Sequence, residues 1–197
     1  AGVVTAAAKW VLDSERTVNS TYDGKGNALT QDITTKTAVL VDGDLPEIVL
    51  VNDMIDMTAG KLPALEDSEK QHVVNSNFTP RGNPRTTVTT TASKDGAVWR
   101  LDSERTVEST YDGKGNALTQ DITIKTAVLV GDDLPAVAID AVTGNIVMPP
   151  ANLLEYSEKQ HVKNSNFTPR GNPRTTVTTT ATYVPADGTK PAKWVLD

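Results

Sequence analysis

The sequence predicts an all-β protein built from two tandem β-sandwich domains of the immunoglobulin-like or jelly-roll type. Three observations lead to this fold class. The 197-residue chain contains one unit written twice, and each unit opens with the alternation of polar and apolar residues that is typical of a strand. Clusters of Gly, Pro and Asn then separate β-branched runs at short spacing, as in sandwich folds.

The duplication indicates the domain organisation. Trp10–Ala92 recurs without insertion or deletion as Trp99–Ala181, and 58 of the 83 aligned pairs are identical. Similarity at a fixed period is the signature of structural repeats. We therefore expect a first sandwich, a second sandwich, and the start of a third repeat or a donated strand, over residues 1–95, 96–192 and 193–197.

The first stretch of each unit alternates with period two. The mismatches Val11/Arg100 and Asn19/Glu108 fall on the same parity, which a solvent face tolerates and a core face does not. The other parity is expected to face the core. Its core candidates are Trp10, Leu12, Val18 and Tyr22, with Trp99, Leu101, Val107 and Tyr111 as their equivalents.

The next elements follow from turn chemistry. Tyr22–Asn27 carries two glycines, an Asp and an Asn, which predict a hairpin turn before a return strand over residues 28–41. Asp42–Pro46 predicts a second turn. Further along, one or two helical turns are expected over Ala64–Val73, and a breaker cluster at residues 78–84 precedes a final strand over residues 85–92.

Differences between the copies concentrate in one block of constant length. Of the 25 mismatches, 18 lie in Glu47–Ala64 against Ala136–Leu153, where no aligned pair matches. Each unit is therefore a constant frame that carries a variable segment, here called the cassette. Ile48–Val51 and Val137–Ile139 are predicted strands, and the remainder of each cassette is predicted to be irregular or short-stranded.

The run Arg16–Thr34 resembles the strand, Asp-x-x-Gly-Asn turn and strand of bacterial immunoglobulin-like tandem repeats in surface adhesins, over about a fifth of a unit. The resemblance implies tandem sandwich domains on a cell surface, and it carries no catalytic residues. Tyr22–Asn27 also matches the YD repeat of large bacterial shell and toxin proteins. Those motifs recur at much shorter spacing, so this second resemblance is set aside.

Composition narrows the classes of partner. With 19 basic and 25 acidic residues interspersed, the chain lacks the concentrated positive charge that nucleic acid requires. It has no Cys, hence no disulfide and no thiolate metal site. No apolar run is long enough to span a bilayer. A start at Ala1, as signal-peptide removal leaves, predicts an extracellular or cell-surface location, and Asn19, Asn77 and Asn166 lie in N-glycosylation sequons.

The residues predict no enzyme. His72 and His161 occupy equivalent positions without His or Cys at ligand spacing, and are interpreted as surface residues. Calcium is the one cofactor considered, because loop carboxylates suit it, and ordinary turn acids are the alternative. Its candidate ligands are Asp42, Asp44, Asp132 and Asp133, with Asp23, Asp53 and Asp56 also available. The two arginines of Pro80–Arg85 are expected to pair with acids or to bind a carboxylate or glycan.

Two functions remain in competition. The first is a non-catalytic extracellular structural protein that self-associates head to tail into a surface filament by β-strand addition. Its predicted assembly residues, which copy Lys9–Asp13, are Lys193, Trp194, Val195, Leu196 and Asp197. The alternative is a tandem-domain cell-surface adhesin or stalk fragment that binds a surface glycan. Trp10 and Trp99 as sugar platforms are a third hypothesis, which their predicted core positions disfavour.

Overall fold

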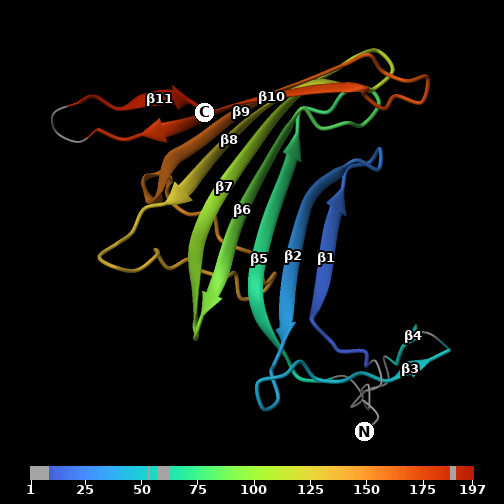
Figure 1. Cartoon of the computed structure of the whole chain (residues 1–197), viewed down its shortest axis with the longest axis vertical. Coiled ribbons are helices and arrows are strands. Elements are labelled where there is room, and N and C mark those ends of the chain that lie inside the picture. The colour runs from blue at the N-terminus through green and yellow to red at the C-terminus, as the bar shows by residue number, and fades with distance from the viewer. Residues whose placement is uncertain (1–8, 53, 57–62, 187–189) are drawn as a thin grey trace, which may run out of the picture. The chain divides into compact units, whose positions relative to one another are not determined.

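The computed structural model describes residues 9–52, 54–56, 63–186 and 190–197 (Figure 1). Over these residues the protein is all-β and contains a large antiparallel sheet, which confirms the predicted class. The strands of this sheet are β1 (Ser14–Tyr22), β2 (Ala28–Ala38), β5 (Leu65–Ser76), β6 (Thr86–Asp95), β7 (Val98–Tyr111), β8 (Ala117–Ala127), β9 (Leu154–Ser165), β10 (Thr175–Val184) and β11 (Lys193–Leu196). The cassettes contribute β3 (Leu50–Val51), β4 (Met54–Ile55) and the short 3-10 helix η1 (Ala151–Leu153).

The two-sandwich arrangement is not confirmed. A sandwich needs two sheets packed face to face, whereas the strands of both repeats share one sheet in the order β1-β2-β5-β6-β7-β8-β9-β10-β11. The reason lies at the predicted boundary between residues 95 and 96. Gly96 and Ala97 form a two-residue turn, with Gly96 at a φ of 56°, and this turn makes β6 and β7 antiparallel neighbours. The domain limits 1–95, 96–192 and 193–197 stay a prediction.

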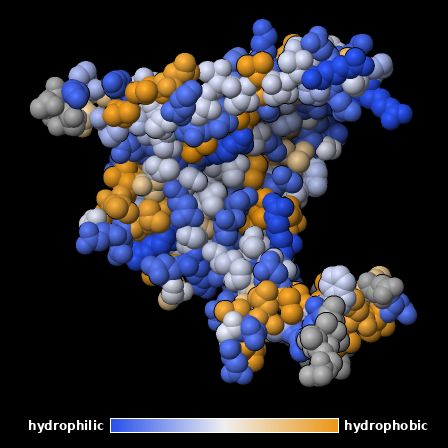
Figure 2. All heavy atoms as spheres, viewed as in Figure 1, coloured by the Kyte–Doolittle hydropathy of each residue, from blue (hydrophilic) through white to orange (hydrophobic). Residues whose placement is uncertain are grey.

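The first compact unit takes in Ala1–Thr17 and Thr34–Glu69. In it the cassette pairs with the start of the repeat. Leu12 N donates to Pro46 O at 2.9 Å and Ile48 N donates to Trp10 O at 3.0 Å, and Leu12 is buried. The β3–β4 hairpin that follows exposes Val51, Met54 and Ile55, and Figure 2 shows apolar surface in this region.

The second compact unit takes in Val18–Ile33 and Lys70–Asp197, where β6 to β11 lie side by side (Figure 1). Its cassette packs where β6 meets β7. Leu101 N donates to Pro135 O at 2.8 Å, and Thr90 Oγ1 lies 3.6 Å from Met148 Sδ. Leu101, Thr90 and the cassette residue Ile146 are buried. The second cassette therefore completes the core where the two repeats meet.

Most of the predicted turns form, and one of them differs between the copies. Asp42 and Gly43 both have positive φ, 54° and 90°, which defines a type I′ hairpin turn. In the second copy the dipeptide is reversed, and only Gly131 has positive φ, at 70°, as a type II′ turn requires. Either dipeptide, Asp-Gly or Gly-Asp, therefore forms a two-residue turn whose backbone twist matches that of the flanking strands.

Two predictions about secondary structure are wrong, one in the frame and one in the cassettes. The segment expected to be helical, Ala64–Val73, enters strand β5, and its copy in β9 pairs with β8 on one side and β10 on the other. Pairing on both edges outweighs a weak helical preference. The cassette strands are also shorter than predicted: only Leu50–Val51 forms a strand in the first, and Ile139 makes a single bridge with Ile146 in the second.

Candidate assembly site at the joint between repeats

The two repeats meet along β6 and β7, which we call the joint. The pairing runs from Thr86↔Glu108 to Asp95↔Val98 and shifts register between Thr91 and Ala92. The extra residue at this shift is Asp102, which accepts a hydrogen bond from Ser93 Oγ at 2.9 Å. The joint is therefore a full strand pairing and not a flexible linker.

At one end of the joint, a loop of the first repeat contacts a turn of the second. Arg81 Nε donates to Gly113 O at 3.1 Å, and Asn83 Nδ2 donates to Gly115 O at 3.3 Å. Tyr111 donates its hydroxyl hydrogen to Pro84 O at 2.9 Å. Two side chains of Pro80–Arg85, Arg81 and Asn83, thus each bind a backbone carbonyl. The expected pairing of the arginines with acids did not anticipate this role, because carbonyl acceptors leave no trace in the sequence.

At the opposite end, Trp99 lies under two cations. Lys70 Nζ is 5.4 Å and Lys94 Nζ is 5.7 Å from the centroid of its ring, within the range of cation–π attraction. Arg100 Nη2 is 3.5 Å from Asp133 Oδ2. The tryptophan that opens a repeat is therefore held by the repeat before it.

The predicted assembly residues, Lys193–Asp197, pair with β10 in the way that the start of β7 pairs with β6 at the joint. Ala181 pairs with Leu196 and Tyr183 with Trp194, which are the counterparts of Ala92 with Leu101 and Lys94 with Trp99. Lys159, the copy of Lys70, lies 5.0 Å from the Trp194 ring centroid, and Asp197 N donates to Thr180 O at 3.1 Å. β11 thus occupies the register in which a repeat begins. Its pairing is within its own chain, and donation to a neighbour stays a prediction.

The β1 edge of the sheet and the part of β10 that β11 leaves unpaired present the two halves of the same joint. Val18 is 44 % exposed on β1 and its copy Val107 is 7 % exposed on β7. Tyr22 is exposed and Tyr111 half-buried. The core prediction is therefore confirmed for Leu12, Leu101 and Val107, whereas Trp99 and Tyr111 are only half-buried. It is wrong for three residues in or just before β1. Those three, which have no preceding repeat beside them, are Trp10, Val18 and Tyr22.

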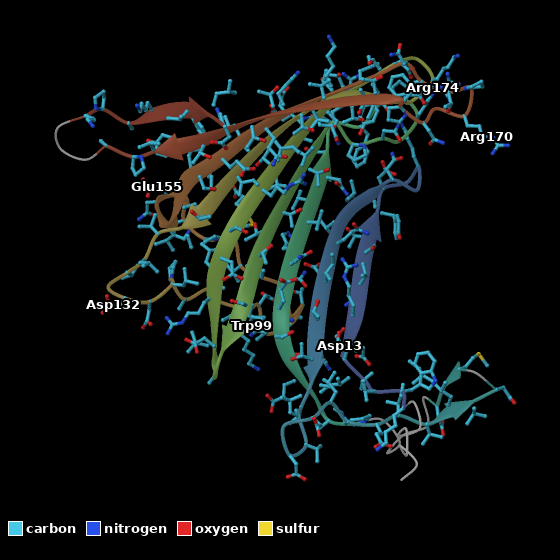
Figure 3. The ribbon with its side chains drawn as sticks, viewed as in Figure 1. Asp13, Trp99, Asp132, Glu155, Arg170 and Arg174 are labelled. Carbon is cyan, nitrogen blue, oxygen red and sulfur yellow. The ribbon has the colours of Figure 1, made fainter. Side chains whose placement is uncertain are left out.

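The free edge of β10 carries the corresponding loop. Figure 3 shows Arg170 and Arg174, the copies of Arg81 and Arg85, on the loop between β9 and β10 at the end of the second unit. Both are exposed, as are Thr175 to Thr179, whereas the copies Thr86 to Thr89 on β6 are half-buried. The sequence alone does not distinguish these positions, because exposure here depends on the neighbouring strand.

The histidines pair across strands. His72 Nδ1 is 2.6 Å from Asp32 Oδ1, and His161 Nδ1 is 2.6 Å from Asp121 Oδ1. His161 lies on the surface as expected, whereas the His72 side chain is mostly buried. Each histidine thus pairs with an aspartate on the neighbouring strand.

The calcium candidates fall on the two tight turns. Asp42 and Asp132 are central turn residues, and Asp44 and Asp133 close the turns by bridging to Val41 and Val130. Asp53 lies outside the described residues. Across the described part of the chain, no three His, Cys, Asp or Glu residues gather at metal-binding distance. Calcium binding stays a prediction.

The acidic residue of each hairpin turn has a lowered pKa. Asp23 Oδ1 accepts hydrogen bonds from the backbone of Asn27 at 2.9 Å and of Lys25 at 2.8 Å, and the bond from Asn27 is the main cause of its lowered pKa. Asp112 accepts the same bonds from Asn116 and Lys114, and its pKa is lowered for the same reason. Each carboxylate closes its turn in the charged form.

We expect both turns to loosen in acid. A folded-state pKa below the ordinary 3.8 means that the ionised carboxylate adds stability above that value, and that this stability is lost as the pH falls through the folded pKa. Melting temperatures measured from pH 7 down to pH 2 should drop below about pH 4. In an Asp23→Asn, Asp112→Asn chain this part of the drop should be smaller; an unchanged drop would exclude these turns as its source.

Comparison with protein-family models, curated proteins and solved structures gives no match. No helix among the described residues has the length and apolar character needed to cross a membrane.

Proposed function

We propose that this chain is a non-catalytic structural protein whose repeats extend one β-sheet, and that copies of it associate head to tail by strand addition. In this assembly the free edge of β10 accepts β1 of a second copy in the register that β6 and β7 use. A second copy is the partner, and no cofactor takes part.

One observation carries the proposal: the two free edges match the two strands that already pair inside the molecule. Thr175–Ala181 of β10 is identical in sequence to Thr86–Ala92 of β6. Ser14–Tyr22 of β1 differs from Ser103–Tyr111 of β7 only at Asn19/Glu108. Unpaired strand edges are templates for pairing, and here the complementary sequence is present in the same molecule. Contacts of this head-to-tail type extend without closing unless the rotation brings the ends together.

We place the assembly outside the cell. The sequons and the resemblance of Arg16–Thr34 to tandem repeats of bacterial surface adhesins support this location. The resemblance also supports tandem folding units, although the shared sheet favours open repeats over closed sandwiches.

The adhesin or stalk fragment is the second candidate, and the cassettes are the observation in its favour. The first cassette exposes Val49, Val51, Met54 and Ile55, while the frame around it is nearly constant between copies. In that case the frames act as spacers, and the variable cassettes meet a ligand such as a surface glycan.

Sedimentation velocity over a range of concentrations, followed by electron microscopy, separates the two. Edge addition predicts concentration-dependent oligomers and end-to-end fibres at neutral pH, with no requirement for Ca²⁺. A chain that stays monomeric at high concentration contradicts self-assembly and leaves the spacer function.

Removal of Lys193–Asp197 distinguishes edge addition from strand donation. β11 lies in the register that Trp10–Leu12 of an incoming copy would take, so edge addition predicts that the shortened chain associates more tightly, by roughly tenfold. Strand donation predicts that assembly is lost. Sedimentation velocity of the two chains at equal concentration measures the difference.

A further inference from the structure

Resting on the proposed self-association, we propose that the Thr168–Arg174 loop is a recognition site for one backbone structure, the Tyr22–Asn27 turn of a second copy. The loop lies at the free end of the sheet in the second unit (Figure 3), and its copy in the first repeat already binds a turn of this sequence. We assign the Tyr22–Asn27 turn as the occupant because the first loop already binds the copy of this turn within the molecule.

The loop has the same shape with and without a bound turn. Thr79 N donates to Asn83 O and Gly82 N donates to Thr79 O, both at 2.9 Å, in the copy that holds a turn. In the free copy, Thr168 N donates to Asn172 O and Gly171 N donates to Thr168 O at the same distances. Binding therefore requires little ordering of this loop, which favours affinity.

A glycine in each loop keeps its shape. Gly82 and Gly171 both have a φ of 84°, and a Cβ on either would overlap the Asn side chain of the preceding turn, Asn27 or Asn116. Each loop is thus packed against the turn of its own repeat on one side. The other side of the first loop contacts the turn of the second repeat.

The ligand turn is equally preformed. Asp23 Oδ1 accepts the amides of Lys25 and Asn27, as Asp112 Oδ1 accepts those of Lys114 and Asn116. The exposed hydroxyl of Tyr22 is the copy of the Tyr111 hydroxyl that donates to Pro84 O.

Each hydrogen bond between loop and turn in the joint has an equivalent between the Thr168–Arg174 loop and the Tyr22–Asn27 turn of a second copy. Arg170 Nε would donate to Gly24 O of the second copy, Asn172 Nδ2 to Gly26 O, and the Tyr22 hydroxyl of that copy to Pro173 O. These are the equivalents of the hydrogen bonds made by Arg81, Asn83 and Tyr111. The groups that the loop recognises are the backbone carbonyl oxygens of a tight turn and one phenol hydroxyl. The site therefore selects for the geometry of the turn and for the tyrosine, and it does not select for a charged ligand.

Two variants of the full chain test the site, one on each side of the contact. Arg170→Ala removes the donor from the loop and Tyr22→Phe removes the hydroxyl from the turn. Each should weaken association by about five- to tenfold without lowering the melting temperature. The internal copies Arg81→Ala and Tyr111→Phe are matched controls, which should lower the melting temperature and leave association unchanged.

Mixing the two variants gives the decisive result. In a mixture, the Tyr22→Phe chain supplies an intact loop and the Arg170→Ala chain supplies an intact turn, so one wild-type contact forms per pair. Dimers of wild-type affinity are expected in sedimentation velocity, and they should extend further only at much higher concentration, because the next contact would join two defective halves. Variants that associate like the wild type overturn the recognition site alone, whereas a wild-type chain that remains monomeric overturns both this site and the assembly.

Discussion

Replacing Leu101 with alanine should lower the free energy of unfolding by about 3 kcal/mol. Its side chain has no exposed surface, and its backbone amide bonds to Pro135 O beneath the second cassette. The cavity left by the missing atoms lies where β6, β7 and the cassette meet, so little of the surroundings can collapse into it. Urea denaturation followed by circular dichroism measures the change.

The chain offers its own control for this result. Leu196 is the copy of Leu101 in β11 and is 69 % exposed. Leu196→Ala should therefore change the unfolding free energy by less than about 0.5 kcal/mol. Equal effects at the two positions would show that the cassette does not complete the core as described.

Replacing Thr178 with proline should abolish most of the self-association while the chain stays folded. Thr180 O accepts from Asp197 N, so the amides of Thr180 and of alternate residues such as Thr178 point to the free edge. Proline removes that outward donor and is tolerated on an edge strand. The association constant should fall roughly tenfold to hundredfold, measured by sedimentation equilibrium.

Two further substitutions isolate the backbone effect. Thr178→Ala keeps the amide and should associate like the wild type. Thr89→Pro places the same change in the internal joint, where Thr89 pairs with Arg105, and should lower the melting temperature. If Thr178→Pro chains associate normally, β10 is not the accepting edge.

Local chemistry made the turns of the frame predictable from sequence. The turn at Tyr22–Asn27 forms as expected. Gly26 adopts the positive φ that the turn requires, and the Asp23 carboxylate accepts the backbone amide of Asn27. Period-two alternation likewise predicted the first strand. The same alternation arises in a sandwich and in a single sheet covered by cassettes, so it did not choose between them.

The joint was predictable only in part. The five residues at 193–197 were recognised from their identity with Lys9–Asp13, and the structure places β11 in the register of a repeat start. The Gly96-Ala97 dipeptide, with Gly at the first central position, was a hairpin signal between two strands, and it joins the repeats in one sheet. The exposure of Tyr22 and the carbonyl partners of Arg81 had no such signal, because both depend on which strand lies alongside.

Each repeat contributes four strands to the main sheet, and this even number has a consequence for any longer array. A chain that crosses the sheet four times returns to the end from which it started, so successive repeats are related by translation and twist without inversion. Because neighbouring strands are antiparallel, the Tyr22–Asn27 turn, the loop at residues 77–85 and their copies fall at one end of the strands, and the cassettes and the Gly96–Ala97 turn fall at the other. At about 4.8 Å per strand, the variable cassettes of a longer array would recur every ~19 Å along one end of its strands, and the constant turns and loops would recur at the same interval along the other.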